Sequence, residues 1–150
     1  MTMEAILEQW VARMAQASGG ETAQFLTREK DPFRNPVGHL LRENLAVLLQ
    51  ELLGEMDPSR TGPALDALLR VHAVQDLTAS QAVGFIFWLR PLLATGRPDL
   101  DPQQLNQLID QLALQAFEGY VRCREQLAEI RLGESRRSMA ILADRSQRKS

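Results

Sequence analysis

The side chains best suited to chemistry in this sequence are two histidines and one cysteine, His39, His72 and Cys123. Imidazole is a common ligand of haem iron, so either histidine is a candidate haem ligand if the fold is globin-like. His72, however, lies on the apolar side of its predicted helix, where a hydrogen-bonded core histidine is the commoner interpretation. A single cysteine forms neither an internal disulfide nor a thiolate cluster, and we predict no metal site and no cofactor.

A second candidate site is a group of polar residues near residue 77, where one predicted helix ends and another begins. These residues could bind a ligand beside the aromatic ring of Phe85, but helix capping and a buried ion pair explain them equally well. Aromatic residues at helical spacing more often fill a core than line a pocket. The candidate ligand-binding residues are Arg70, His72, Gln75, Asp76, Gln81 and Phe85.

Composition narrows the class of protein. With 150 residues, of which 45% are hydrophobic, the chain can form one domain with one core. A charged fraction of 24% and a net charge of −2 are typical of an ordinary globular surface and do not favour a nucleic-acid partner. We find no serine elbow, phosphate loop or metal-spaced histidine pair, and we predict that the protein is not an enzyme.

The sequence also predicts a cytoplasmic protein that does not insert into a membrane. The N-terminus lacks the basic start and apolar stretch of a secretory signal. The longest uncharged apolar run, residues 82–89, is far shorter than the roughly 20 residues that cross a bilayer. The single cysteine fits a reducing compartment.

Apolar residues recur every three or four positions along most of the chain, and this period predicts helices. Asn35 and Pro36 can cap and begin one helix, and Thr78 with Gln81 forms a capping-box pattern. We expect Gly84 to permit close approach of a neighbour and Pro91 to bend or end its helix. The predicted elements are a first helix ending at 18–20, a short helix over 21–30, a turn at 31–35, a helix from 36 to 53, a loop over 54–62, a helix over 63–75, a helix from 79 and a last helix from 102.

The last predicted helix is the longest, and its apolar stripe extends beyond the point that a core of about 130 residues can cover. We expect it to pack along one side only, with glutamines and charges opposite. After residue 131 the composition becomes basic, which predicts a helical extension that is partly disordered. This extension is a solvated end, a contact to a partner protein, or a weak contact to nucleic acid or membrane. The candidate partner-binding residues are Tyr120, Cys123, Leu127, Ile130, Arg136 and Arg137.

These patterns predict an all-α fold. We expect a single compact domain of five to six helices, globin-like or a helical bundle, with a long C-terminal helix. The predicted division is a helical sensory domain over residues 1–131 and a basic C-terminal extension over 132–150.

Three blocks of sequence resemble the RsbRD N-terminal domain family. They are residues 31–38 (DPFRNPVG), residues 70–76 (RVHAVQD) leading into 80–85 (SQAVGF), and residues 116–120 (AFEGY) with Arg124 and Glu125. The order and spacing match from about Trp10 to Arg131. The resemblance implies a helical, globin-related and dimeric sensory domain of bacterial signalling proteins, attached in its relatives to stressosome co-antagonists or other output domains, and without haem.

Only about twenty residues follow this resemblance, too few for an output domain. The function we expect is therefore that of a stand-alone regulatory or sensory module that acts through protein–protein interaction. Its expected partners are a second copy, in a homodimer, and a separate signalling or output protein. The alternative is a globin-like accessory protein that holds haem or another flat ligand near His72 and Phe85.

Overall fold

The computed structural model describes residues 1–17, 31–74 and 77–148, and every regular element within them is helical. This confirms the all-α fold class and the long C-terminal helix. The short helix predicted over 21–30 lies outside the described residues. The elements are α1 (Met3–Ala17), α3 (Pro36–Leu52), α4 (Pro58–Val74), α5 (Ala79–Val83), the 3-10 helix η1 (Gly84–Ile86), α6 (Leu89–Gly96) and α7 (Pro102–Arg148).

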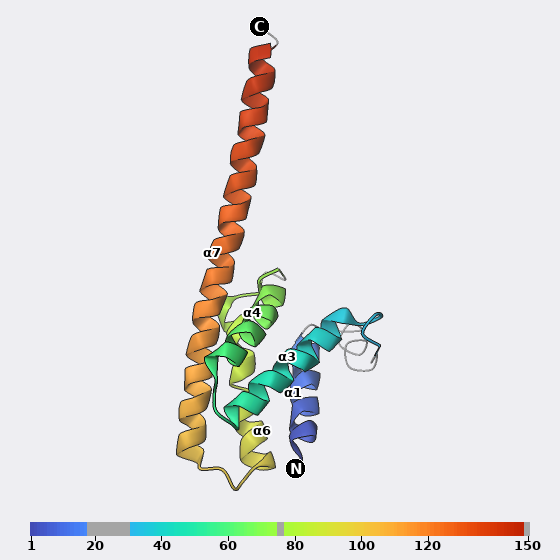
Figure 1. Ribbon diagram of the computed structural model, residues 1–150, viewed down its shortest axis with the longest axis vertical. Coiled ribbons are helices and arrows are strands. Elements are labelled where there is room, and N and C mark those ends of the chain that lie inside the picture. Colours follow the sequence, from blue (N-terminus) through green and yellow to red (C-terminus); the bar gives the residue numbers. More distant parts are fainter. Residues whose placement is uncertain (18–30, 75–76, 149–150) are drawn as a thin grey trace.

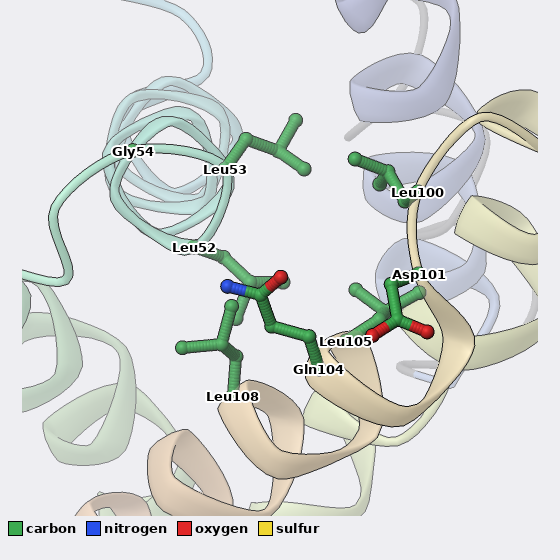
Figure 2. A pocket seen from close by; sticks show the side chains of 8 residues that line it. All are labelled: Leu52, Leu53, Gly54, Leu100, Asp101, Gln104, Leu105 and Leu108. Atoms are coloured by element: carbon green, nitrogen blue, oxygen red, sulfur yellow. The ribbon is translucent and has the colours of Figure 1, made fainter.

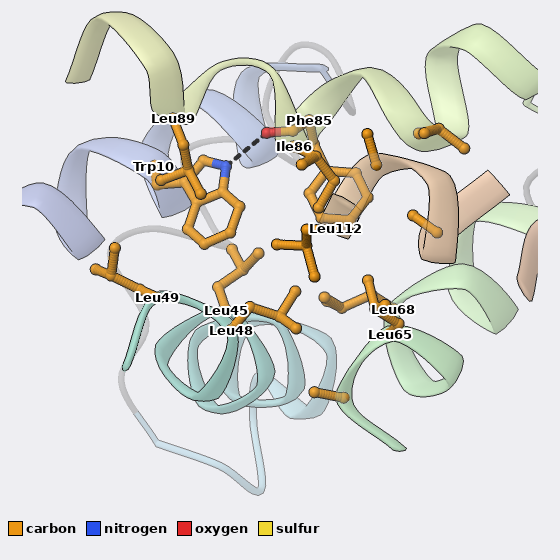
Figure 3. Packing of buried hydrophobic residues seen from close by; sticks show 14 of the residues in the cluster. Trp10, Leu45, Leu48, Leu49, Leu65, Leu68, Phe85, Ile86, Leu89 and Leu112 are labelled. Carbon is orange, nitrogen blue, oxygen red and sulfur yellow. Dashed lines mark hydrogen bonds between the residues drawn. The ribbon is translucent and has the colours of Figure 1, made fainter. Parts of the chain in front are cut away.

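One hydrophobic core joins these helices. α3 packs against α1 and α4, while α7 runs along α4, α5, η1 and α6 (Figure 1). In the centre of the core Trp10 and Phe85 stack, and Leu45, Leu68 and Leu112 approach them from three different helices (Figure 3). Burial of such side chains is the main contribution to the stability of the fold. We call this packed part of the molecule the body.

The start of α3 is as predicted. The Asn35 side chain accepts a hydrogen bond from the Gly38 backbone N–H at 2.8 Å, and Pro36 occupies the first helical position. Asn35 is almost fully buried. A Cβ atom on residue 38 would lie only 2.1 Å from the Asn35 side-chain nitrogen, so this cap requires glycine there.

The predicted loop over residues 54–62 is wrong in its second half, because α4 begins at Pro58 and not at Pro63. The Asp57 carboxylate accepts bonds from the Ser59 N–H at 3.0 Å and the Ser59 hydroxyl at 2.9 Å. These two bonds lower the pKa of the Asp57 carboxyl. Asp57 therefore holds the first turn, while Pro58 supplies a favourable first residue, and Pro63 lies inside the helix.

The segment after residue 77 starts as predicted and is then interrupted. Thr78 and Gln81 form the reciprocal capping box at the start of α5. The helix breaks at η1, and α6 begins anew with Pro91 in its first turn. Proline has no backbone N–H to donate to the carbonyl four residues earlier, and its ring clashes with that carbonyl. The Phe87 carbonyl instead accepts from the Arg90 N–H at 3.1 Å.

The close approach expected at Gly84 is wrong, since no atom lies within 4 Å of a Cβ built there. The tight positions are elsewhere. A Cβ on Gly96 would lie 2.9 Å from the Ile6 side chain, and one on Gly119 would lie 2.8 Å from the Leu69 side chain. These two glycines let α6 approach α1 and let α7 approach α4.

α7 is much longer than the body that it packs against (Figure 1). Its buried residues end at Cys123, and Leu127 is half-buried. From Ala128 to Arg148 every residue is exposed except the half-buried Gly133. We call residues 128–148 the arm. The arm is helical throughout, and residues 149–150 lie outside the described residues.

The bond between Trp10 and Phe85 provides a test of the core. The Trp10 indole N–H donates to the Phe85 carbonyl at 2.8 Å, deep inside the protein. The substitution Trp10→Phe removes this donor and some ring volume, and we expect it to lower the free energy of unfolding by about 2–3 kcal/mol in urea titrations. The control Trp88→Phe, at a half-buried position, should cost about 1 kcal/mol or less. Equal effects would contradict this account of the core.

Candidate functional site

His72 lies inside the protein at the junction between α4 and α5. Its Nδ1 atom is 2.9 Å from the Ala82 carbonyl oxygen. A carbonyl only accepts, so Nδ1 carries the proton and donates it. The edge of the Phe85 ring meets the imidazole at 81°, with the ring centroids 5.4 Å apart. These contacts place His72 in the role of a hydrogen-bonded core residue.

Tyr120 on α7 fastens the same junction from the other side. Its hydroxyl donates to the Leu77 carbonyl at 2.6 Å, and the Leu77 N–H donates to the His72 carbonyl at 3.4 Å. The turn that leads into α5 is thus tied both to α4 and to α7. A displacement of α7 at Tyr120 would therefore strain or break the hydrogen bond to the Leu77 carbonyl.

The predicted ligand-binding residues that the structure describes differ in burial. His72 and Phe85 meet in the core, whereas Arg70 and Gln81 are exposed on the surface. The Gln81 side chain accepts from the Thr78 N–H at 3.0 Å as part of the helix cap. Gln75 and Asp76 lie outside the described residues. Capping thus accounts for Gln81, and core packing accounts for His72 and Phe85.

Burial lowers the pKa of His72 below its ordinary value of 6.5, although the bond to Ala82 acts in the opposite direction. The unfolded chain therefore takes up a proton at this histidine at a higher pH than the folded chain does. The contribution of His72 to stability is present above pH 6.5 and is lost as the pH falls through the folded-state pKa.

We expect the free energy of unfolding of the wild type to fall as the pH is lowered from 7 to 5. For this one group the slope is at most about 1.4 kcal/mol per pH unit. The substitution His72→Gln should remove this part of the pH dependence in urea titrations. The control His39→Gln, at an exposed position, leaves His72 and its contribution in place. An unchanged slope in His72→Gln would contradict the role assigned to the buried imidazole.

A small pocket of about 210 Å³ opens between the end of α3 and the start of α7 (Figure 2). Asp101 and the Gln104 amide are its polar groups, and leucines form most of its wall. It is smaller than the roughly 300–1,000 Å³ of a typical ligand site, so it suits one apolar side chain or a very small molecule. Its residues are Leu52, Leu53, Gly54, Leu100, Asp101, Gln104, Leu105 and Leu108.

The sequence did not reveal this pocket, because its residues come from two helix ends far apart in the chain. Each of them has an ordinary role by itself. Leu52 belongs to α3, and Leu105 and Leu108 belong to α7, whereas Leu53 and Leu100 flank these helices. Asp101 accepts from the Gln103 N–H near the start of α7. Only the packing of the two helix ends brings them together.

One buried acid has a structural role. Glu51 has only 7% of its side chain exposed, and its carboxylate lies 3.2 Å from the Arg60 guanidinium and 3.0 Å from the Asp57 N–H. Its backbone carbonyl accepts from the Met56 N–H at 2.9 Å, where Met56 has a positive φ of 52°. Glu51 therefore stabilises the tight turn between α3 and α4.

The predicted partner-binding residues divide into two groups. Tyr120 and Cys123 are 6% and 7% exposed and contact the body itself. Burial raises the pKa of the Cys123 thiol, which favours the protonated thiol and a role as a small core residue. Leu127 marks the end of the body, and only the residues beyond it project into solvent. These are Ile130, Arg136 and Arg137.

α7 carries apolar residues on more than one side, so the expectation that it packs along one side only is incomplete. Leu114, Phe117 and Val121 are exposed to 67%, 49% and 37% although they lie beside the body. The polar residues predicted opposite the core are present, but this apolar line runs next to them. Its spacing of three and four residues is the signal by which the sequence could have revealed it.

Two further classes of site are not found in the described part of the chain. No group of three or more His, Cys, Asp or Glu side chains there is placed to hold a metal ion. Among the described helices, none has a stretch both long and apolar enough to span a bilayer.

The structure defines the chain as an all-α domain with one core and a terminal helix that projects from it. The family model of the RsbT co-antagonist protein rsbRD N-terminal domain matches residues 4–134, and the chain belongs to this family. The family is one of sensory and regulatory domains of the stressosome type and is not known as one of enzymes. No curated protein and no solved structure matches the chain.

Proposed function

We propose that this domain regulates by binding other protein chains, as a homodimer and through contact with a separate signalling protein in the cytoplasm. In this proposal residues 1–131 are the sensory domain, and residues 132–150 are the extension that partners contact. Membership in a family of sensory and regulatory domains supports it.

The observation that carries the proposal is the exposed arm of α7. Helices acquire most of their stability in water from packing an apolar face against a partner. The arm has apolar residues, but no other described part of the chain packs over them. Its large exposed apolar residues are Ile130, Leu132, Met139, Ile141 and Leu142, each at least 51% exposed.

Charge supports a protein partner for the arm. The arm contains five basic and three acidic residues, a net charge of +2, and the chain total of −2 leaves −4 on the other residues. A basic arm favours an acidic protein surface by electrostatic complementarity. The arm has no aromatic residue to stack on a base, which disfavours a single-stranded nucleic acid.

The alternative function, haem or another flat ligand near His72 and Phe85, has less support. Haem ligation needs an imidazole nitrogen that faces the iron. The Nδ1 bond of His72 to Ala82 leaves Nε2 for such a role, but His72 is only 6% exposed and its ring packs against Phe85 in the core. The small pocket at the end of α3 is lined by other residues.

The homodimer has a direct test in solution. Sedimentation equilibrium at micromolar concentration should give twice the chain mass of 16.9 kDa. A mass of one chain across the micromolar range would contradict the homodimer.

The separate partner requires a different experiment. A photo-crosslinking amino acid at Arg137, on the exposed arm, should yield in cells an adduct with a protein other than this chain. The same amino acid at Gln50, which is exposed on α3, serves as the matched control. Adducts that contain only this chain, or equal adducts at both positions, would contradict a partner that contacts the arm.

A further inference from the structure

The pocket between the end of α3 and the start of α7 combines an apolar wall with two polar side chains (Figure 2). Five leucines form the wall, and the Asp101 carboxylate and the Gln104 amide lie at the start of α7. α7 packs along α4, α5, η1 and α6 but has little contact with α3. The two helix ends therefore meet without filling the space between them.

The two polar side chains of the pocket have few partners within the protein. Asp101 accepts one long bond, of 3.4 Å, from the Gln103 N–H, and it forms no ion pair with another described residue. The Gln104 amide forms no hydrogen bond to the described part of the chain. Both residues are exposed, so they can contact a ligand without rearrangement of the core.

The electrostatics of the pocket favour a cation. The end of α3 and the start of α7 carry partial charges of opposite sign, roughly half an elementary charge each, which largely cancel. The Asp101 carboxylate adds a whole negative charge, and no Arg, Lys or His among the described residues lines the pocket. The pocket would therefore repel a carboxylate and attract an ammonium group.

The wall and the volume of the pocket determine the rest of the ligand. A hydrocarbon chain against the leucines would be stabilised in proportion to the apolar area that it removes from water. The volume of about 210 Å³ admits only a small molecule, because typical ligand sites measure roughly 300–1,000 Å³. A short, branched carbon chain with one positive charge meets both conditions.

We propose that this pocket binds a small aliphatic amine, with its carbon chain against the leucines and its ammonium group on the Asp101 carboxylate. The Gln104 side-chain oxygen would accept a second hydrogen bond from the ammonium group. The bound amine would connect α3 with α7. Binding does not depend on the homodimer, and only its use as the signal that the sensory domain detects rests on the proposed function.

Three ligands with the same carbon chain test the class of ligand. In NMR titrations of the full chain at neutral pH, isoamylamine should shift the amides of residues 52–54 and 100–108 with a dissociation constant on the order of 1 mM. Isovalerate, its carboxylate counterpart, should bind about tenfold more weakly, and isoamyl alcohol should lie between the two. Equal binding of amine and carboxylate, or no shift of these amides, overturns the inference.

Removal of one charge tests the position of the ammonium group. Asp101→Asn keeps a side chain that can cap a helix, and it should weaken amine binding about threefold to fivefold while binding of the alcohol stays the same. The matched control Asp110→Asn changes an exposed aspartate of α7 outside the pocket and should leave both affinities nearly unchanged. Equal losses of amine binding in the two variants contradict an ammonium group on Asp101.

Obstruction of the pocket tests the position of the carbon chain. Gln104→Trp places a large ring at the pocket and should abolish binding of both the amine and the alcohol. The matched control Gln107→Trp, at an exposed position of α7 outside the pocket, should leave binding intact. Both positions are exposed, so both variants should keep the helical circular dichroism of the wild type. Binding that survives Gln104→Trp overturns the inference.

The outcomes separate this inference from the proposed function. Failure of the amine to bind in the pocket leaves the homodimer and the separate partner standing, because neither uses these residues. A wild-type monomer that binds the amine in the pocket overturns the homodimer and supports this inference.

Discussion

The body covers α7 only as far as Leu127, and this limit divides the helix into a packed part and an exposed arm. On the covered side, α7 contributes a continuous line of core residues to α4, α5 and α6. Beyond Leu127, the same helix continues to Arg148, and its residues are exposed except for the half-buried Gly133. Helices in water gain most of their stability from such packing, and the proposed contact with another chain would supply it.

Three side-chain hydrogen bonds connect helices within the body. Trp10 bonds to the Phe85 carbonyl, His72 to the Ala82 carbonyl and Tyr120 to the Leu77 carbonyl. All three acceptors belong to the segment between α4 and α6, which contains only short helices. This segment depends on side-chain donors from its neighbours, and it connects the position of α7 to α1 and α4.

Much of the fold was predictable because its signals are local. Asn35 and Thr78 each act within a few residues, and the helix starts beside them agree with the structure. Pro91 does not end its helix, because it lies in the first turn of α6. The predicted start of α4 was wrong because Asp57 and Pro58 suit a helix start as well as a loop. Helices approach closely at Gly96 and Gly119 and not at Gly84, because tertiary packing determines which glycines face a neighbouring helix. The pocket likewise depends on how distant helices meet.

Hydrogen exchange of the α7 amides tests most directly whether the arm owes its stability to a second chain. At concentrations that favour the dimer, we predict protection both in residues 105–123 and in the arm. On dilution below the dissociation constant, protection in the arm should be lost while that in residues 105–123 remains. An arm that exchanges at the same rate at both concentrations would contradict the central claim.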